Sequence, residues 1–320
     1  MTDLSIIIVT YKGWRRLDSC LAEISSYQNK TFSKEIIVVD NTPDENEISF
    51  IKEKYPFFTY IHNTVNGGYG YGVNRGAEIS RGEFLLVLNP DTVATEKAVD
   101  ALLAVPLQNT RFNVVSCRQV NEKGNESTVA GSFPEFRNLT GFMRTIFRKS
   151  EFASEGNYIF PDWVSGSVML FRKDDFNKLK GFDEDFWMYF EDVDICRRIV
   201  NSGGTVAIAK NILIEHNHGG SSRTNLKTAA LTKTEVQMSR HVYINKHKSG
   251  VNRAGIQLFL VINNILINLL LAVPGIIFFF VPKVRLRLLI TIRLTGYYLN
   301  SAIKKTWISP CSINYNRNKG

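Results

Sequence analysis

Long runs of apolar residues recur along the first 90 positions of the chain, and each is followed by a more polar segment. Four runs are rich in β-branched and aromatic residues and are predicted to be strands: LSIIIVTY (4–11), EIIVVDN (35–41), FFTYIHN (57–63) and EFLLVLN (83–89). Helices are predicted after the first run, from the apolar spacing of Trp14, Leu17, Leu21 and Ile24, and over residues 70–80. This alternation favours an α/β fold with a doubly wound parallel sheet, and the unbroken apolar runs predict that both sheet faces are covered.

The pattern becomes less regular after residue 110. NVVSCRQV (113–120) and DWVSGSVMLFR (162–172) are strand candidates, with a long loop over 121–160 between them. A helix is predicted from about 192 to 201, ending at Gly203-Gly204. We therefore divide a predicted catalytic domain, 1–235, into a nucleotide-binding half (1–110) and an acceptor half (111–235).

The remaining residues, 236–320, differ in composition from the domain that precedes them. From residue 237 onward the chain holds twelve Lys and Arg and no Asp or Glu, whereas the first 236 residues hold 27 basic and 30 acidic side chains. The net charge of +9 therefore belongs to the tail. Between its basic flanks the tail reads IQLFLVINNILINLLLAVPGIIFFFVP (256–282). Such a run predicts an anionic membrane surface as the partner, and no nucleic acid.

The apolar run is long enough to cross a bilayer, but it contains Pro274-Gly275 and has basic residues on both sides. Because basic flanks favour the cytoplasmic side, we predict a re-entrant or surface-lying element that bends at Pro274. A buried pair of core helices and a single membrane span remain alternatives. The chain also shows no N-terminal signal peptide, which predicts the cytoplasmic face of the cell membrane.

Polar residues follow four successive predicted strands or lie just before a helix: Thr10-Tyr11, Asp40-Asn41, Asn66-Gly67-Gly68 and Asn89-Pro90-Asp91. Any one of them could be an ordinary turn or a helix cap. In a parallel sheet, however, ligands bind at the carboxyl ends of the strands, so the four sites are predicted to converge on one ligand.

Seven motifs in order give the chain a resemblance to the inverting family-two glycosyltransferases of the GT-A type, near their rhamnosyltransferase-like branch. They are SIIIVTY (5–11), IIVVDNTPDE (36–45), NGGYGYGVNRG (66–76), FLLVLNPDT (84–92), GSVMLFRKDDF (166–176), GFDEDFWMYFEDVDICRRI (181–199) and HNHGGSS (216–222). The resemblance implies a GT-A, Rossmann-like nucleotide-diphospho-sugar transferase fold, here followed by a membrane-associating helical region.

The resemblance also implies where the nucleotide-sugar donor binds. Thr10 and Tyr11 should lie at the base, with Tyr11 stacked on it, and Asp40 should accept a hydrogen bond from base or ribose. Asn66 and Gly67 should let the backbone approach the nucleotide closely.

A divalent metal, Mg²⁺ or Mn²⁺, is implied at the DxD-type motif of the family, where this chain has Asn89 in place of the first acid. Only Asp91 keeps a carboxylate there, and Asn89 would contact the ligand through its amide. His216, the first residue of HNHGGSS, is the further metal ligand that the resemblance implies.

Inversion by direct displacement needs a base that takes the proton of the acceptor hydroxyl. FEDVDICRRI places Glu191, Asp192 and Asp194 at the start of a helix, where acids are common for electrostatic reasons alone. Asp194 and Arg198 also form an ordinary i, i+4 pair. By resemblance to the family, Asp192 is the base and Glu191 helps to orient the acceptor.

Together these features predict an inverting, metal-dependent hexosyltransferase that uses a dTDP- or UDP-linked sugar. The expected acceptor is a saccharide, lipid-linked, in the assembly of a bacterial cell-surface polysaccharide such as O-antigen. A sugar nucleotidyltransferase and a non-enzymatic membrane scaffold are the alternatives. The former should carry a GxGTR-like loop after the first strand, where this chain reads TYKGWRRLDS.

Overall fold

The computed structural model describes residues 2–28, 31–43, 48–139, 151–217, 225–278 and 280–315. It divides into two compact units. The first comprises Met1–Asp183 and Glu191–His218, and the second comprises Glu184–Phe190 and Gly219–Gly320. We call them the sheet unit and the helical unit.

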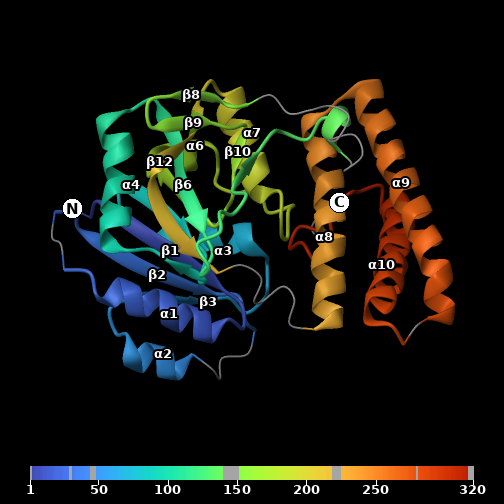
Figure 1. Cartoon of the computed structure of the whole chain (residues 1–320), viewed down its shortest axis with the longest axis horizontal. Helices are drawn as coiled ribbons and strands as arrows, with labels where there is room; N and C mark the ends of the chain where they lie inside the picture. Colours follow the sequence, from blue (N-terminus) through green and yellow to red (C-terminus); the bar gives the residue numbers. More distant parts are fainter. Residues whose placement is uncertain are drawn as a thin grey trace. The chain divides into compact units, whose positions relative to one another are not determined.

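The sheet unit is built on one large sheet with the strand order β3-β2-β1-β4-β11-β6-β12-β9-β8 (Figure 1). The four strands at one side are the four predicted from the first apolar runs: β1 (Leu4–Thr10), β2 (Lys34–Asp40), β3 (Thr59–His62) and β4 (Phe84–Leu88). All four are parallel, with Thr10 paired to Asp40 and Asp40 paired to His62. Their carboxyl ends therefore meet at one edge, as the sequence predicts.

The other half of the sheet corrects the prediction of a fully parallel arrangement. β11 (Val168–Arg172) runs antiparallel to both β4 and β6 (Phe112–Val120). β12 (Thr205–His216) returns parallel to β6, and its far end pairs antiparallel with β5 (Thr92–Val93). The predicted strand 162–172 is also not one strand: it divides into β10 (Trp163–Val164) and β11, and β10 pairs with β7 (Ala130–Gly131) in a small separate sheet.

Helices cover both sheet faces, as the apolar runs predict. α1 (Trp14–Ser25), α2 (Ser49–Lys54) and α4 (Glu96–Gln108) pack on the face that carries Leu4, Ile6 and Ile8. α3 (Tyr69–Ile79) lies on the opposite face, where glycines permit a close approach. A Cβ at Gly72 would lie 2.6 Å from Val9 Cγ1, and one at Gly76 would lie 2.6 Å from Ile7 Cγ2. This contact places the glycine-rich turn before α3 against the ends of β1 and β2.

The remaining elements of the sheet unit are short, apart from α7. They are the hairpin of β8 (Ala153–Glu155) and β9 (Tyr158–Phe160), a 3₁₀ turn η1 (Phe136–Asn138), and the helices α6 (Lys173–Lys178) and α7 (Glu191–Asn201). α7 confirms the helix predicted over 192–201. Its first residue directly follows the segment Glu184–Phe190, which belongs to the helical unit.

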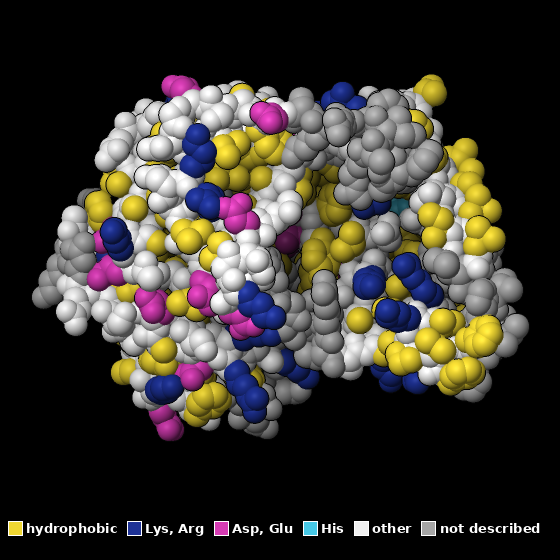
Figure 2. Space-filling view, viewed as in Figure 1, with side chains coloured by type: hydrophobic (Ala, Val, Ile, Leu, Met, Phe, Trp, Pro, Cys, Tyr) yellow, Lys and Arg dark blue, Asp and Glu magenta, His cyan; other side chains and the backbone are white. Residues whose placement is uncertain are grey.

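The helical unit contains α8 (Leu226–His247), α9 (Gly250–Ile277) and α10 (Pro282–Lys304), and each contacts the other two. α9 continues through Pro274 as far as Ile277, where the helix ends, and the bend expected at Pro274 stays a prediction. Among the described residues, α9 is the one helix long and apolar enough to cross a membrane. Its window Gly250–Ile267 has a mean hydropathy of 1.3 and is 22% buried. Figure 2 shows hydrophobic side chains on the surface of this unit, with Lys and Arg beside them.

Candidate active site

The predicted donor-binding residues of the first two strands meet at the carboxyl edge of the sheet. Asn41 N–H donates to Thr10 O at 2.9 Å, and Asn63 N–H donates to Asp40 O at 2.9 Å. The side chain of Asn41 then links this edge to the glycine turn, because its Nδ2 donates to Gly68 O at 2.8 Å. Its Oδ1 accepts from Asn63 Nδ2 at 2.8 Å. The buried amides of Asn41 and Asn63 thus hold together the loop after β2, the loop after β3 and the glycine turn.

The predicted donor-binding residues differ in how exposed they are and in the contacts that they already make. Tyr11 is 44% exposed and follows β1 directly, so its ring has an open face. Asp40 is fully buried, and its two carboxylate oxygens accept from Thr42 N–H at 2.8 Å and Tyr60 Oη at 3.0 Å. The observed contacts of Asp40 therefore hold β2 and β3 together, and its contact with a nucleotide stays a prediction.

Thr10 and the turn 66–68 are tightly packed at this edge. Thr10 Oγ1 is buried and has no hydrogen-bond partner among the described residues. Asn66 Oδ1 accepts from Gly68 N–H at 3.2 Å, and Gly68 has a φ of 97°, in the region that favours glycine. At Gly67, a Cβ would lie 2.4 Å from Tyr71 Cδ1. The turn therefore requires glycine at 67 and 68 to pack against its own helix.

Asn89, Asp91 and His216 come together, as the sequence predicts, although 125 positions separate Asp91 from His216. His216 Nε2 lies 3.2 Å from Asp91 Oδ1 and 3.5 Å from Asn89 Nδ2. The pairing of β12 with β5 produces this contact by placing His216 opposite Thr92. Arg16 of α1, which sequence reasoning missed, reaches Asp91 Oδ2 at 3.5 Å.

Gln119, near the end of β6, orients His216, and sequence reasoning missed this residue too. Its Oε1 lies 2.8 Å from His216 Nδ1 and accepts from Ser167 Oγ at 2.8 Å. Gln119 Oε1 can accept the Nδ1 proton, which would leave the lone pair of Nε2 to a cation beside Asp91. A glutamine buried in the apolar run NVVSCRQV was the available signal.

The donor set fits a divalent cation held partly by protein and partly by substrate. The separation of 3.2 Å between Asp91 Oδ1 and His216 Nε2 is close to the ~3 Å expected for two adjacent ligands of one ion. Among the described residues there is no group of three or more His, Cys, Asp and Glu side chains that could hold a metal. The protein thus offers an acid and an imidazole, and a diphosphate would supply further oxygens.

Glu191 and Asp192 begin α7, but their carboxyl groups have different surroundings. Asp192 Oδ2 accepts from Gly166 N–H at 3.0 Å, and its Oδ1 accepts from Val193 N–H at 2.8 Å. Glu191 is buried, and its Oε2 has no hydrogen-bond partner among the described residues. The backbone therefore stabilises a negative charge on Asp192 and offers less to Glu191.

Burial raises the pKa of both acids, and for Glu191 the adjacent Asp192 raises it further, well above the usual carboxyl range. For Asp192 the backbone N–H groups of Gly166 and Val193 oppose the effect of burial on the pKa. Within the pair, burial and the neighbouring acid favour the protonated form of Glu191, and the backbone hydrogen bonds favour the charged form of Asp192.

Tyr69, at the start of α3, connects the acid pair with Asp91. Its hydroxyl donates to Gly166 O at 2.7 Å, so it holds the same residue whose N–H binds Asp192. Burial raises the pKa of Tyr69, and the nearby carboxyl groups of Glu191, Asp192 and Asp91 raise it further. All three carboxyl groups therefore act on the same phenol. Gly166 stands in the motif GSVMLFRKDDF, but no sequence signal assigned it this contact.

Asp194, the third acid of the segment, is a structural residue. It is 1% exposed, and its Oδ2 accepts from Arg198 Nε at 2.7 Å. Arg198 also donates to Leu179 O at 2.7 Å and Gly181 O at 2.9 Å. The pair therefore fixes the loop after α6, in agreement with the i, i+4 reading of the sequence. The GGSS run (219–222) that accompanies His216 lies outside the described residues.

Comparison with known proteins gives a family match over more than half of the chain. The model of glycosyl transferase family 2 matches residues 5–179, and one described as the N-terminal domain of galactosyltransferase matches 148–219. The low-salt glycan biosynthesis hexosyltransferase Agl10 of Haloferax volcanii is 30% identical over 206 residues, which are 62% of this chain and 62% of that protein. The match thus spans less than two thirds of that relative.

Two rhamnosyltransferases are also similar to the chain. The N-acetylglucosaminyl-diphospho-decaprenol L-rhamnosyltransferase of Mycobacterium tuberculosis is 27% identical over 230 residues, covering 63% of this chain and 72% of that one. Rhamnosyltransferase WbbL of Escherichia coli K12 is 28% identical over 180 residues, covering 52% and 67%. These relatives confirm the predicted resemblance to the rhamnosyltransferase-like branch.

Among solved structures, the crystal structure of GalNAc-T7 with UDP, GalNAc and Mn²⁺ is similar with a TM-score of 0.54. It is 14% identical, and the match covers 75% of this chain and 51% of that one. At this identity the likeness shows the fold alone, and it confirms the GT-A fold predicted from the sequence.

Proposed function

Because this chain belongs to glycosyl transferase family 2, we propose that it transfers a hexosyl group, with inversion, from a nucleotide-diphosphate sugar to a saccharide acceptor. The observation that carries the proposal is the unequal acid pair at the start of α7. Asp192 accepts two backbone hydrogen bonds, which favour its carboxylate form, whereas burial favours the protonated form of Glu191. Transfer of this kind needs one ionised carboxylate that can receive the proton of a hydroxyl.

In the proposed reaction, Asp192 accepts the proton of the acceptor hydroxyl while that oxygen attacks the anomeric carbon. The C–O bond to the diphosphate breaks on the opposite face, and the nucleoside diphosphate leaves. Gly166 N–H and Val193 N–H hold the Asp192 carboxylate in place. Protonated Glu191 can donate a hydrogen bond and so help to orient the acceptor.

The edge formed by Asn89, Asp91 and His216 is the proposed binding place of the donor diphosphate. A divalent cation, Mg²⁺ or Mn²⁺, would be held by Asp91 and His216 and would neutralise charge on the leaving group. Gln119 keeps the Nε2 lone pair of His216 directed at this place. Tyr11, with its exposed ring, is the proposed stacking partner of the base, and the donor is a dTDP- or UDP-linked sugar.

The acceptor is proposed to be lipid-linked, with the reaction at the cytoplasmic face of the membrane. The name of the mycobacterial relative includes a decaprenol-linked substrate. In the helical unit, α9 exposes large apolar side chains at helical spacing: Leu258, Ile262, Ile265 and Leu266. Phe278 and Phe280, close to Lys283, Arg285 and Arg287, are also exposed. Apolar groups beside basic ones fit insertion into an anionic membrane surface.

A donor screen by titration calorimetry tests the function. The full chain is titrated with UDP- and dTDP-linked hexoses, including dTDP-rhamnose, with Mn²⁺ or Mg²⁺ and again in EDTA. We expect one nucleotide sugar to bind in the presence of metal and to release its nucleoside diphosphate over time. Absence of binding by every nucleotide sugar tested would overturn the proposal, and binding without any sugar transfer or hydrolysis would favour a non-enzymatic role.

A further inference from the structure

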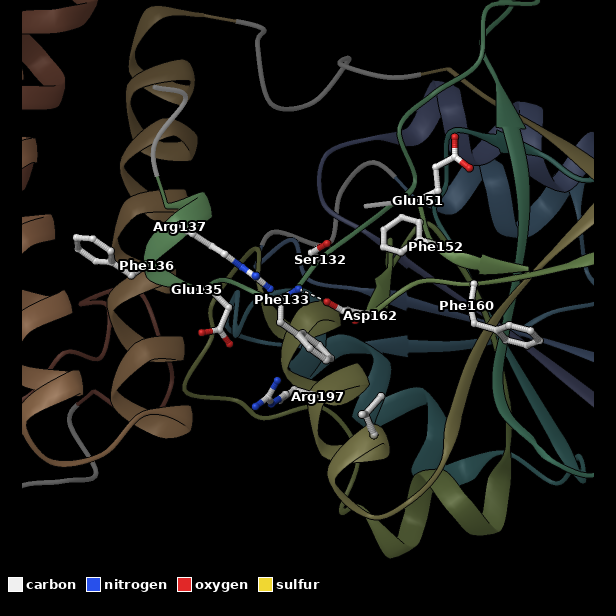
Figure 3. Close-up of a pocket in the computed structure, with 12 residues that line it drawn as sticks. Ser132, Phe133, Glu135, Phe136, Arg137, Glu151, Phe152, Phe160, Asp162 and Arg197 are labelled. Carbon is white, nitrogen blue, oxygen red and sulfur yellow. Dashed lines mark hydrogen bonds between the residues drawn. The ribbon is translucent and has the colours of Figure 1, made fainter. Parts of the chain in front are cut away.

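A cavity of about 700 Å³ lies in the sheet unit on the flank of α7, apart from the donor-side residues described above. Its lining comes from the segment after β7, from η1, from the β8–β9 hairpin and from α7. In Figure 3, Arg197 of α7 lies beside the ring of Phe133, and Asp162 lies on the other side of that residue. The predicted loop 121–160 contributes most of these segments, so the acceptor half of the domain builds this cavity.

Three polar side chains of the lining have unused hydrogen-bonding capacity. Arg197 Nε is buried and has no hydrogen-bond partner among the described residues, although its guanidinium lies 4.8 Å from the centre of the Phe133 ring. Asp162 uses Oδ2 to accept from Phe133 N–H at 2.8 Å, which leaves Oδ1 available. Ser132 uses its carbonyl to accept from Trp163 Nε1 at 3.0 Å, which leaves its hydroxyl available. A donor, an acceptor and a hydroxyl thus line one cavity.

The rest of the lining favours a neutral ligand with both polar and apolar faces. Phe136, which is 49% exposed, and the part-exposed Phe152 offer ring surface on which the C–H face of a sugar can pack. Carboxylates outnumber guanidinium groups in the lining: Glu135, Glu151 and Asp162 against Arg137 and Arg197. That balance opposes a diphosphate, whereas a sugar ring with neighbouring hydroxyl groups can bond to donors and acceptors alike.

The cavity is linked by short stretches of chain to the residues that hold the proposed base. Arg197 follows Asp192 by five positions on the same helix, a rise of roughly 7.5 Å and a rotation of about 140° around the helix axis, so the two side chains leave different faces of α7. Asp162 precedes Gly166, the donor to Asp192, by four positions, and β10 between them is fixed by pairing with β7. The cavity therefore shares its supporting elements with the proposed base without containing it.

We propose that this cavity is an acceptor subsite for a neutral sugar residue that is not itself glycosylated, with Arg197 and Asp162 as its polar contacts. The proposal rests on the proposed function, which supplies the acceptor. It names the part of the enzyme that distinguishes one acceptor glycan from another.

Saturation-transfer NMR on the full chain tests the subsite without any donor. The saccharide probes are methyl α-L-rhamnoside, N,N′-diacetylchitobiose, cellobiose and methyl α-mannobioside. Inorganic pyrophosphate is added to them as the anionic competitor. We expect at least one neutral saccharide to bind, and Arg197→Gln to weaken it about tenfold, the usual effect of losing hydrogen bonds to a charged group. Arg197→Lys keeps the charge but not the planar fork, so it should also bind weakly.

Two further variants make the result specific. Asp162→Asn keeps an oxygen for Phe133 N–H and should weaken the same saccharide. Arg118→Gln removes an exposed arginine of the same unit, paired with Glu126 outside the cavity, and should bind the saccharide like the unaltered protein. Thermal denaturation of each variant shows whether it is folded.

The proposal is overturned if no neutral saccharide binds, if pyrophosphate displaces the saccharide, or if folded Arg197→Gln and Asp162→Asn proteins bind it unchanged. Nucleotide-sugar binding is measured on separate samples. Failure of donor binding would count against the proposed function, while the saccharide measurement would still decide the subsite.

Discussion

The substitution Asp192→Asn tests the proposed base because the structure predicts what it removes. The amide has nearly the shape of the carboxylate, but it cannot accept the proton of an attacking hydroxyl. In the folded chain, Asp192 accepts from Gly166 N–H and Val193 N–H. Asparagine can keep one of these bonds through its oxygen, and its NH₂ group must face the other N–H.

The magnitudes separate the effect on rate from the effect on stability. Loss of general-base catalysis typically costs 10²- to 10⁴-fold in rate, or about 2.7–5.4 kcal/mol in activation free energy. Loss of one hydrogen bond would cost about 1 kcal/mol of stability, but burying a neutral amide avoids the desolvation of a buried carboxylate. We therefore expect kcat to fall at least a hundredfold while the Tm and the donor Kd stay nearly unchanged.

Asp194→Asn is the matched control two positions along the same helix. It weakens the buried ion pair with Arg198, whose side chain is 24% exposed, and leaves Asp192 intact. We expect a loss of about 3 kcal/mol, near the lower end for breaking such pairs, and a fall in Tm of roughly 6–12 °C. Below its Tm this variant should retain most of its activity.

The assay measures release of nucleoside diphosphate from a radiolabelled nucleotide sugar, with a membrane extract as the source of acceptor. Donor affinity and Tm are measured on the same preparations. An Asp192→Asn protein that keeps more than about a tenth of the wild-type kcat would refute the role of Asp192 as base. Equal loss of rate in a folded Asp194→Asn protein would show that the rate reports helix geometry rather than proton transfer.

Further variants test the metal edge, the acid pair and the tail. Asp91→Ala should abolish metal-dependent donor binding, and His216→Ala should weaken it. Calorimetric titrations equal to wild type in both variants would refute the proposed metal site at Asp91 and His216. Folded Glu191 has a raised pKa, so wild-type stability should fall as pH rises above about 4.3, the ordinary value in an unfolded chain. Glu191→Gln should therefore have a higher Tm than wild type at pH 7 and lose that advantage near pH 4; a pH-independent difference would contradict the assignment. Phe280→Asp should reduce sedimentation with phosphatidylserine vesicles, as should high salt, and unchanged sedimentation would count against this insertion point.

The elements that could be predicted from sequence are those whose signal is local. β1 to β4 are unbroken apolar runs, and in a parallel sheet their carboxyl ends must share one edge. That rule predicts that Asp91 lies near the residues that follow the neighbouring strands. Its contact with His216 came from the resemblance to a family, because pairing between β5 and β12 is not encoded by any pattern near either residue.

The parts that could not be predicted depend on contacts distant in sequence. β11, which runs antiparallel to both of its neighbours, is an apolar run like the parallel strand β4, so composition gives no sign of its direction. Gln119 gains its role only when β6 and β12 lie side by side. Pro274 is a strong helix breaker locally, yet α9 continues through it as far as Ile277.

The division of the helical unit between two stretches of sequence has a consequence for biosynthesis. Met188 O accepts from Ser239, Asp185 binds Lys246 and Asn314, and Glu184 O accepts from Ser312. On a ribosome, this stretch leaves the exit tunnel more than a hundred residues before the last of these partners. The stretch that leads into Glu191 can therefore reach its final conformation only after residues 312–314 have been synthesised. In a nascent chain, the first turn of α7 would settle later than the parallel strands β1 to β4.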